Sequence, residues 1–149
     1  MTHRIIIING PNINLLGERE QSQYGKLSFD DLKLKCSEYA ESQKVIIEFY
    51  QSNVEGEIVT KIQNSRKEYD GVIINAAGFT HSSVSIRDAL EIVKKPKIEL
   101  HISNIYKREE FRQKSLISGV VDGIICGLGV YGYILAINAI QELLKNGNW

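Results

Sequence analysis

Short apolar runs rich in isoleucine and valine alternate along the chain with longer stretches of helical periodicity. This alternation is typical of βαβ units, in which each strand is followed by a crossover helix. It predicts strands at residues 4–8, 45–50, 71–75, 97–102 and 119–126, and helices at 28–42, 56–68, 82–93, 109–114 and 131–145. Five such strands form a parallel sheet covered by helices on both faces, so we expect an α/β fold.

Length and charge narrow the class of protein. The 149 residues, 43% of them hydrophobic, are expected to form one domain over residues 1–149. Eighteen basic and eighteen acidic residues give a formal net charge of zero, so the chain lacks the basic excess that nucleic acids and membrane surfaces attract. No apolar run approaches the length of a signal peptide core or a membrane span. We therefore expect a cytoplasmic protein without nucleic-acid or membrane partners.

The two cysteines, Cys36 and Cys126, lie far apart in the sequence, without a CxxC motif or a cluster of cysteine and histidine. One falls in a predicted helix and the other in a predicted strand. We expect both to be reduced, buried thiols, and we expect no metal site.

Polar residues follow the predicted strands. In open α/β sheets ligands bind outside the carboxyl ends of the strands, so these residues are the candidates for a site. The first connection, Asn9 to Lys26, spans 18 residues, whereas such loops usually have about two to six, and long loops are often binding loops. The candidates are Asn9, Asn12, Arg19 and Tyr24 in that connection, Gln51, Ser52 and Asn53 after the second strand, Asn75, Thr80 and His81 after the third, and His101, Ser103, Arg108 and Arg112 after the fourth.

Glu99 and His101 lie two positions apart on a predicted strand, so their side chains point to the same face. A carboxylate that accepts a hydrogen bond from one imidazole nitrogen determines which nitrogen carries the other proton, and it favours the imidazolium form. Such a histidine can donate a proton near neutral pH. The alternative is a core strand with polar ends, followed by a turn at Ser103 and Asn104.

Arg108 and Arg112 lie four positions apart, so on a helix both guanidinium groups reach the same side. Because a guanidinium binds a carboxylate through two parallel hydrogen bonds, the pair predicts an anionic small-molecule ligand. The alternative is a solvated helix face on which the arginines pair with Glu109 and Glu110.

Arg19 and Tyr24 lie in the long first connection. A phenol ordinarily titrates at about pH 10, so a tyrosine acts as a base at neutral pH only where a positive charge lowers its pKa. Arg19 remains charged and would have that effect. The alternative is that Tyr24 packs against the edge of the sheet as an amphipathic anchor.

The run Gly127-Leu-Gly-Val-Tyr-Gly132 has the glycine spacing of dinucleotide-binding loops. It follows the last predicted strand rather than the first, and the chain ends before an acidic residue on another strand can follow. We therefore expect a tight turn that lets the last helix pack closely. A response regulator would need an acidic cluster after the first strand, where this chain has the amides Asn9 and Asn12.

Several stretches together closely resemble the type II 3-dehydroquinate dehydratases over nearly the whole chain. They are Asn9-Gly-Pro-Asn-Ile-Asn-Leu-Leu-Gly-Glu-Arg19, Tyr24-Gly25, Gln51-Ser-Asn-Val-Glu-Gly56, Asn75 with Thr80-His81-Ser82, Ile86-Arg-Asp-Ala-Leu90, Glu99-Leu-His-Ile-Ser-Asn104 and Arg108-Glu-Glu-Phe-Arg112. The chain departs from the family pattern at Gln21, where the family often has proline, and at Ala76-Ala-Gly-Phe79, which replaces a more usual Pro-Gly-Ala-Tyr.

The resemblance implies a flavodoxin-like sheet and the reversible dehydration of 3-dehydroquinate to 3-dehydroshikimate, a step of the shikimate pathway of aromatic amino acid biosynthesis. It implies an enolate mechanism without metal or organic cofactor, and a homododecamer built from trimers. The implied catalytic residues are Tyr24 as base, Arg19 as its activator, His101 as acid, Glu99 as the residue that orients it, and Asn12 as the residue that stabilises the enolate. The implied substrate-binding residues are Asn75, His81, Ile102, Ser103, Arg108, Arg112 and Asp88, the last reaching the site of a neighbouring subunit.

Two other function classes remain open. A flavin- or nucleotide-binding module of the same fold would explain the sheet and the glycines, but not Arg19, Tyr24, Glu99 and His101 together. A non-catalytic protein that binds a polyhydroxy acid would have the same pocket, and only turnover distinguishes it. A Schiff-base mechanism would need a buried lysine, and we expect none because no lysine lies in an apolar strand.

Overall fold

A five-stranded sheet forms the centre of the protein, and every pairing in it is parallel. The computed structural model describes residues 2–19, 22 and 26–147. The strands lie in the order β2-β1-β3-β4-β5. Because the chain passes from β1 to β2 on one side and then returns to β3 on the other, the direction of winding reverses between β1 and β3. The strands are β1 (Arg4–Asn9), β2 (Ile46–Gln51), β3 (Gly71–Asn75), β4 (Lys97–His101) and β5 (Gly123–Cys126).

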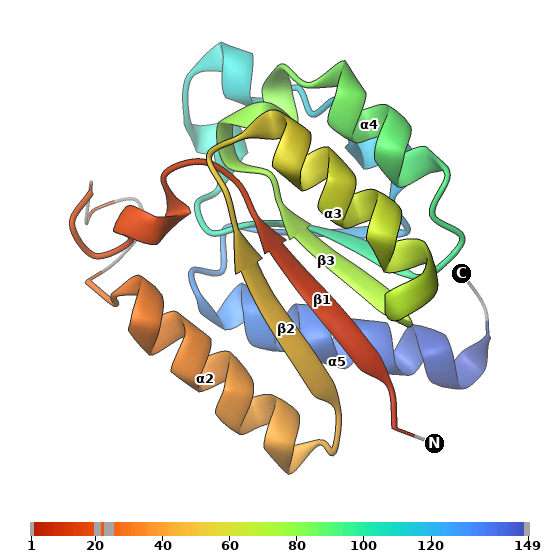
Figure 1. Cartoon of the computed structure of the whole chain (residues 1–149). Helices are drawn as coiled ribbons and strands as arrows, with labels where there is room; N and C mark the ends of the chain where they lie inside the picture. Colours follow the sequence, from red (N-terminus) through yellow and green to blue (C-terminus); the bar gives the residue numbers. More distant parts are fainter. Residues whose placement is uncertain (1, 20–21, 23–25, 148–149) are drawn as a thin grey trace.

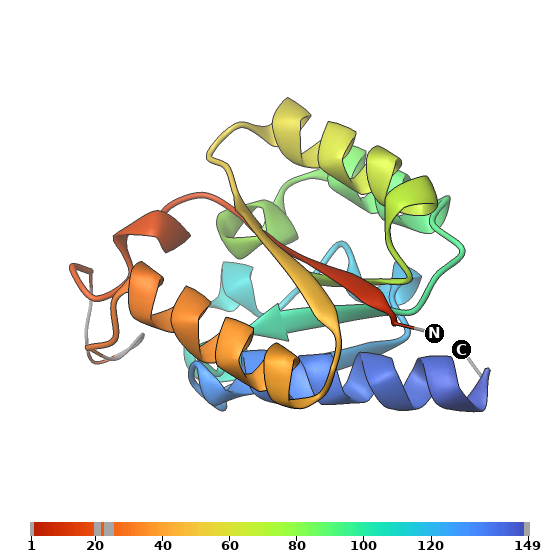
Figure 2. The same ribbon diagram turned by 60° about the horizontal axis from the view of Figure 1, so that its bottom comes forward.

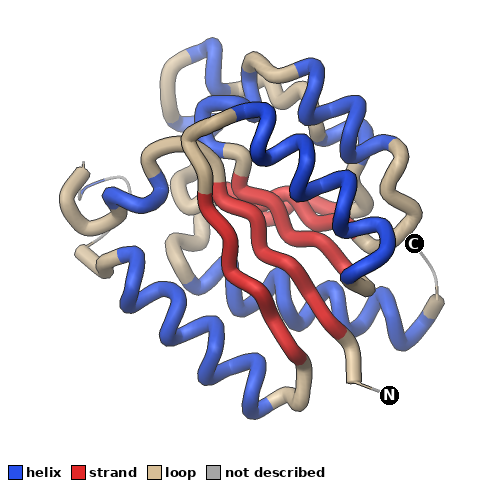
Figure 3. Tube along the Cα trace, in the orientation of Figure 1, coloured by secondary structure: helices blue, strands red, loops and turns tan. Residues whose placement is uncertain are grey.

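Helices cover both faces of this sheet (Figures 1 and 2). On one face lie α3 (Glu55–Glu68) and α4 (Val84–Glu91). On the other lie α2 (Phe29–Ser42) and α5 (Tyr131–Asn146). Figure 3 shows the resulting three layers, with the strands between the two sets of helices. The predicted α/β class and the flavodoxin-like arrangement are confirmed.

The isoleucine run of β1 explains how one strand supports two cores. Ile5 to Ile8 are all fully buried. Successive side chains point to opposite faces, so Ile5 and Ile7 join the apolar cluster under α2 and α5, whereas Ile6 and Ile8 join the cluster under α3 and α4. An uninterrupted apolar run is what a strand buried on both faces requires.

Serine side chains begin two of the helices. The Ser28 hydroxyl accepts a hydrogen bond from the Asp31 backbone N–H, and the Asp31 carboxylate accepts one from the Ser28 N–H, which together form a capping box before α2. Ser83 caps α4 in the same way through the Ile86 N–H. These caps determine where the chain enters each helix after leaving the site end of the sheet.

Two predicted elements differ in the structure. The helix predicted at residues 109–114 is only a 3-10 turn, Glu110–Arg112. This short charged segment forms hydrogen bonds between residues i and i+3, and it does not extend into an α-helix. The strand predicted from residue 119 begins at Gly123, since Ser118–Val120 forms a 3-10 turn. The other predicted strands and helices are present, with ends that differ by at most two residues.

The glycine run after β5 makes a tight turn, as predicted. Gly127 and Gly129 have φ angles of 85° and 63°, a backbone conformation that is strained for residues with a Cβ atom. A Cβ atom on Gly132 would lie 2.8 Å from Leu100 Cδ1. Gly132 therefore allows α5 to pack closely against β4, and Gly127 and Gly129 form the turn before it.

Candidate active site

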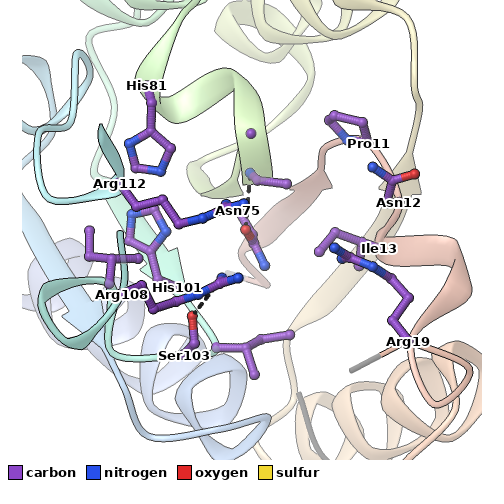
Figure 4. A pocket seen from close by; sticks show the side chains of 14 residues that line it. Pro11, Asn12, Ile13, Arg19, Asn75, His81, His101, Ser103, Arg108 and Arg112 are labelled. Carbon is purple, nitrogen blue, oxygen red and sulfur yellow. Dashed lines mark hydrogen bonds between the residues drawn. The ribbon is translucent and has the colours of Figure 1, made fainter. Parts of the chain in front are cut away.

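A pocket opens at the carboxyl ends of β1, β3 and β4, beside the reversal in winding (Figure 4). It encloses about 580 Å³, including its open mouth. In Figure 4, Asn12 and Arg19 lie across the pocket from His101 and Arg112. Nine residues that the sequence indicated line it: Asn12, Arg19, Asn75, His81, His101, Ile102, Ser103, Arg108 and Arg112. Sequence reasoning did not single out Pro11, Ile13, Ala77, Gly78 and Ile105, which complete the lining.

Two of the implied catalytic and substrate-binding residues that the structure describes, Glu99 and Asp88, do not line this pocket. Glu99 lies behind His101 and is fully buried. Asp88 is exposed on α4 and belongs to no wall of the pocket of its own chain. Tyr24 lies outside the described residues, so its role stays a prediction.

Glu99 and His101 form the hydrogen-bonded pair that the sequence predicted. His101 Nε2 lies 2.5 Å from Glu99 Oε2, and the side chains are only 5% and 1% exposed. The second carboxylate oxygen, Oε1, accepts a hydrogen bond of 2.5 Å from the Ser118 hydroxyl. Burial raises the pKa of Glu99, but the hydrogen bonds from His101 and Ser118 outweigh burial and leave that pKa below its ordinary value. Glu99 is thus ionised and can only accept, so His101 Nε2 carries a hydrogen.

His81 stacks against His101 at the pocket wall. The ring centroids lie 6.3 Å apart and the planes are inclined by 21°. His81 Nδ1 lies 2.9 Å from the Lys114 carbonyl oxygen, which only accepts, so Nδ1 is the protonated nitrogen of the neutral ring. Burial lowers the pKa of His81 below its ordinary value, and the nearby charges of His101 and Arg112 lower it further. A neutral His81 therefore has Nε2 as a hydrogen-bond acceptor.

A buried tyrosine holds Asn75 at the end of β3. Asn75 Nδ2 donates to the Tyr133 hydroxyl over 2.9 Å, and that hydroxyl donates to Asn9 Oδ1 over 2.6 Å. Asn75 Oδ1 also accepts from the Ala77 N–H. Because both ends of the amide are bonded, the orientation of Asn75 in the pocket wall is determined.

The amides after β2 support the loop that carries Asn12. Gln51 Nε2 donates to the Gly10 carbonyl and to Asn53 Oδ1, both over 3.1 Å, and Asn53 Oδ1 also accepts from the Asn12 N–H over 3.0 Å. Asn12 has a φ angle of 71°, which asparagine tolerates better than most residues. Gln51 and Asn53, which the sequence indicated, thus position a lining residue without lining the pocket.

Guanidinium groups give the pocket a cationic character. Arg108 and Arg112 do not share a helix, because Arg108 ends the 3-10 turn Ile105–Lys107 and Arg112 belongs to the next turn, yet both line the pocket. Both also pair with Glu109, whose carboxylate lies 3.2 Å from Arg112 Nε and 3.7 Å from Arg108 Nε. The two arginines therefore both pair with Glu109 and line the pocket, so the two interpretations of the sequence hold together. With Arg19, they favour an anionic ligand.

One lysine contradicts the expectation that no lysine lies in an apolar strand. Lys97 begins β4 and is 8% exposed. Its Nζ donates to the carbonyls of Leu90 and Val93, each over 2.8 Å, at the end of α4. The residue is tolerated in the core because these carbonyls accept its hydrogens. It stands at the amino end of the strand and not among the residues that line the pocket.

The cysteines are both free thiols. Cys36 is buried in α2, and burial raises its pKa to about 12. Cys126 ends β5 and is only partly buried, which corrects the expectation of two buried thiols. Within the described residues, no three His, Cys, Asp or Glu side chains are grouped so that they could hold a metal ion. None of the described helices has both the length and the apolar character that spanning a membrane requires.

A comparison with family models decides the family. The model described as dehydroquinase class II matches residues 3–141. The chain belongs to this family. Class II dehydroquinases are 3-dehydroquinate dehydratases, which are hydro-lyases, so the resemblance drawn from the sequence motifs is confirmed.

Relatives and solved structures agree with this assignment. The chain is 49% identical over 140 residues to the 3-dehydroquinate dehydratase of Thermotoga neapolitana, covering 94% of this chain and 95% of that protein. It is 51% identical over 142 residues to that of Campylobacter jejuni, covering 95% and 89% of the two chains. The type II dehydroquinase of Butyrivibrio crossotus superposes with a TM-score of 0.93 at 45% identity, covering 94% and 98%. A 3-dehydroquinate dehydratase-like protein of Bifidobacterium longum gives 0.73 at 32% identity, covering 97% and 99%.

Proposed function

We propose that this chain is a single-domain 3-dehydroquinate dehydratase that interconverts 3-dehydroquinate and 3-dehydroshikimate in aromatic amino acid biosynthesis. Loss of water from a β-hydroxy ketone needs a base for the proton beside the carbonyl, stabilisation of the enolate, and an acid for the departing hydroxyl. The observation that carries the proposal is the hydrogen bond between Glu99 and His101 at the wall of a cationic pocket.

His101 is the proposed acid. Its Nε2–H is engaged by Glu99, so Nδ1 is the nitrogen through which the ring exchanges a proton with a ligand. When the C–O bond to the departing hydroxyl breaks, Nδ1–H protonates that oxygen, and water leaves. Glu99 stabilises the positive charge of the imidazolium before the transfer and keeps the ring in one orientation.

Tyr24 is the proposed base. Its phenolate would take the proton beside the carbonyl, and Arg19, which lines the pocket, would stabilise the phenolate. The electrons of the broken C–H bond move onto the carbonyl oxygen to form the enolate, which Asn12 would stabilise through a water. Support for Tyr24 comes from the sequence motif and from the family, and support for Arg19 and Asn12 comes also from their place opposite His101.

The remaining lining residues would bind the substrate. Arg112 and Arg108 supply guanidinium groups for the carboxylate and hydroxyls of 3-dehydroquinate. Neutral His81 can accept a hydrogen bond from a substrate hydroxyl through Nε2. Asn75 adds a side-chain amide, and Ile102 and Ser103 would contribute backbone groups.

Assembly remains part of the proposal. Asp88 is exposed on α4, and in a homododecamer of trimers it would reach the active site of a neighbouring subunit. Arg87, which could have paired with it, instead donates to the Leu116 carbonyl over 2.6 Å. We also propose a cytoplasmic enzyme, as expected for this pathway.

The decisive experiment is a turnover assay. Purified protein, treated with a chelator, is mixed with 3-dehydroquinate, and the ultraviolet absorbance of the conjugated enone of 3-dehydroshikimate is followed. A rise in absorbance that survives the chelator supports the proposal. Tight binding of 3-dehydroquinate without any turnover would instead identify a non-catalytic binder, and a co-purified yellow chromophore without turnover would identify a flavin module.

A further inference from the structure

The carboxylate that orients His101 is itself oriented by a neighbouring turn. Glu99 is fully buried, and each of its oxygens has a short contact of 2.5 Å: Oε2 with His101 Nε2 and Oε1 with the Ser118 hydroxyl. Ser115 also contributes to lowering the pKa of this carboxylate, less than His101 and Ser118 do. Without the Ser118 donor on Oε1, the carboxylate would lose one of its two serine contacts, and its rotation would be less firmly determined.

We propose that Ser118 is a positioning residue for the acid: by donating to Glu99 Oε1 it holds the carboxylate in the orientation that directs His101 Nδ1 into the pocket. Ser118 does not line the pocket and touches no reacting atom, so it acts through Glu99. This inference rests on the proposed function, because it concerns the same acid.

The backbone of the turn places the Ser118 hydroxyl. The Ser115 hydroxyl accepts hydrogen bonds from the N–H groups of Ile117 and Ser118, each over 3.2 Å. Such side-chain to backbone bonds compete with strand pairing and stabilise turns. They explain why residues 118–120 form a 3-10 turn, although the sequence pattern predicted a strand from residue 119. In a strand that paired from residue 119, this turn would be lost, and with it the position of Ser118.

Three further bonds hold the same segment against the residues that follow β3. His81 Nδ1 donates to the Lys114 carbonyl over 2.9 Å, and the Leu116 N–H donates to the Thr80 carbonyl over 2.9 Å. Arg87, on α4, donates to the Leu116 carbonyl over 2.6 Å. The donor to Glu99 is therefore supported from two sides, by its own turn and by the adjoining wall of the pocket.

The first test is kinetic. Ser118→Ala removes the donor, and we expect kcat to fall by about 10- to 100-fold, by analogy with the loss of hydrogen-bond partners behind metal-bound histidines, with KM within about twofold. Ser118→Thr keeps the hydroxyl and should retain most of the wild-type kcat. The matched control is Ser65→Ala, which removes a buried hydroxyl that donates to the Ile62 carbonyl on α3, far from Glu99, and should leave kcat unchanged.

The second test does not depend on turnover. The chain has three histidines, so nitrogen-15 labelling of histidine gives few ring resonances, which a His101→Gln variant assigns. In the wild type we expect a strongly deshielded Nε2–H proton from the short bond to Glu99. Ser118→Ala should shift or broaden it, whereas Ser118→Thr and Ser65→Ala should leave it in place.

The outcomes separate this inference from the proposed function. If the wild type binds 3-dehydroquinate without turnover, the proposed function fails, and the His101 resonances still decide on Ser118. A Ser118→Ala variant with unchanged His101 resonances overturns the inference, and so does one with wild-type kcat. Should Ser118→Ala not fold, Ser118→Cys takes its place, because a thiol of similar size is a weaker donor. A smaller loss of kcat and a smaller shift then support the inference, and wild-type values overturn it.

Discussion

The hydroxyl of Tyr133, on α5, accepts a hydrogen bond of 2.9 Å from Asn75 Nδ2, at the end of β3. The residue thus connects a core helix to the wall of the pocket. The same hydroxyl donates to Asn9 Oδ1, at the end of β1. One buried phenol therefore holds the ends of two strands between which the winding reverses.

Tyr133→Phe is expected to weaken both the fold and the site. It leaves a buried donor on Asn75 and a buried acceptor on Asn9 without this partner, which costs about 1–3 kcal/mol in the free energy of unfolding. KM for 3-dehydroquinate should rise because Asn75 is less firmly held. Urea denaturation and steady-state kinetics measure the two effects. Tyr131→Phe, at a side chain that is 58% exposed, is the control. Equal unfolding midpoints for wild type and Tyr133→Phe would contradict the role given to this hydroxyl.

His101→Ala should lower kcat by at least about 100-fold, because the departing hydroxyl loses its proposed acid. KM should change far less, since substrate binding is assigned mainly to other residues. The control is His3→Ala, because His3 precedes β1 at the opposite end of the sheet and lies 3.8 Å from Asp70. Turnover of His101→Ala at the wild-type rate would mean that another group donates the proton.

Tyr24→Phe should abolish turnover and leave the affinity for the product within a few fold. The phenylalanine keeps the ring but has no oxygen to take the proton. Calorimetric titration with 3-dehydroshikimate measures affinity apart from catalysis. Tyr106→Phe, at a side chain that is 58% exposed, serves as the matched control. A Tyr24→Phe variant with near-wild-type activity would refute the assignment of the base.

The stability of the protein should decrease as the pH falls through the range in which His81 titrates. Burial, with the charges of His101 and Arg112, lowers the pKa of His81 in the folded state below its ordinary value of 6.5. As the pH falls below 6.5, the unfolded chain binds the proton first, so this contribution to stability is present above 6.5 and is lost as the pH falls through the folded-state pKa. His81→Asn keeps an N–H donor for the Lys114 carbonyl but does not titrate. Urea denaturation from about pH 5 to pH 8 should show that the free energy of unfolding of this variant depends less steeply on pH than that of the wild type. Identical slopes for the two proteins would contradict the role given to His81.

Exchanging the alanine at position 77 with the glycine at position 78 is expected to stabilise the folded protein. Ala77 has a φ angle of 52°, where a side chain costs roughly 1 kcal/mol, and a glycine is more usual there in the family that the sequence resembles. Gly78 has no positive φ, and a Cβ atom there would meet nothing within 4 Å. Ala77→Gly combined with Gly78→Ala should therefore raise the free energy of unfolding by about 1–2 kcal/mol. Thermal melts of the single and double variants test this, and a lower melting temperature for Ala77→Gly would be the contrary result.

The hydrophobic pattern predicted the sheet well because buried parallel strands leave little choice of composition. The run from Ile5 to Ile8 can satisfy two apolar clusters only as a central strand. The same rule failed at residues 119–122, where a strand was predicted, because the hydrogen bonds of Ser115 to the backbone stabilise a turn there, and composition does not show them. The separate expectation that no lysine lies in an apolar strand failed at Lys97, whose burial depends on the position of two carbonyls at the end of α4.

The pocket residues could be predicted because the carboxyl ends of parallel strands meet at one edge. Asn75 and His101 each stand at the end of a strand, so their meeting follows from topology. Tyr133 could not be found in this way, since it lies inside a helix and reaches the site only through the packing of α5. Ser118 likewise acts on the site from a turn beyond it. Residues that hydrogen bond the site residues without lining the pocket thus depend on tertiary contacts, and the pattern of polar and apolar positions does not predict these contacts.

The alternation along β4 has a consequence for how the chain avoids misfolded forms. Ile98 and Leu100 point into the apolar cluster under α2 and α5, whereas Lys97, Glu99 and His101 occupy the alternate positions that face the other side. A slip of one residue against β3 would exchange these faces and force three ionisable side chains into that cluster. A chain with the wrong strand register would therefore be too unstable to persist as a folded but inactive competitor. Glu99 and His101, the proposed catalytic pair, thus also disfavour pairing of β4 in the wrong register.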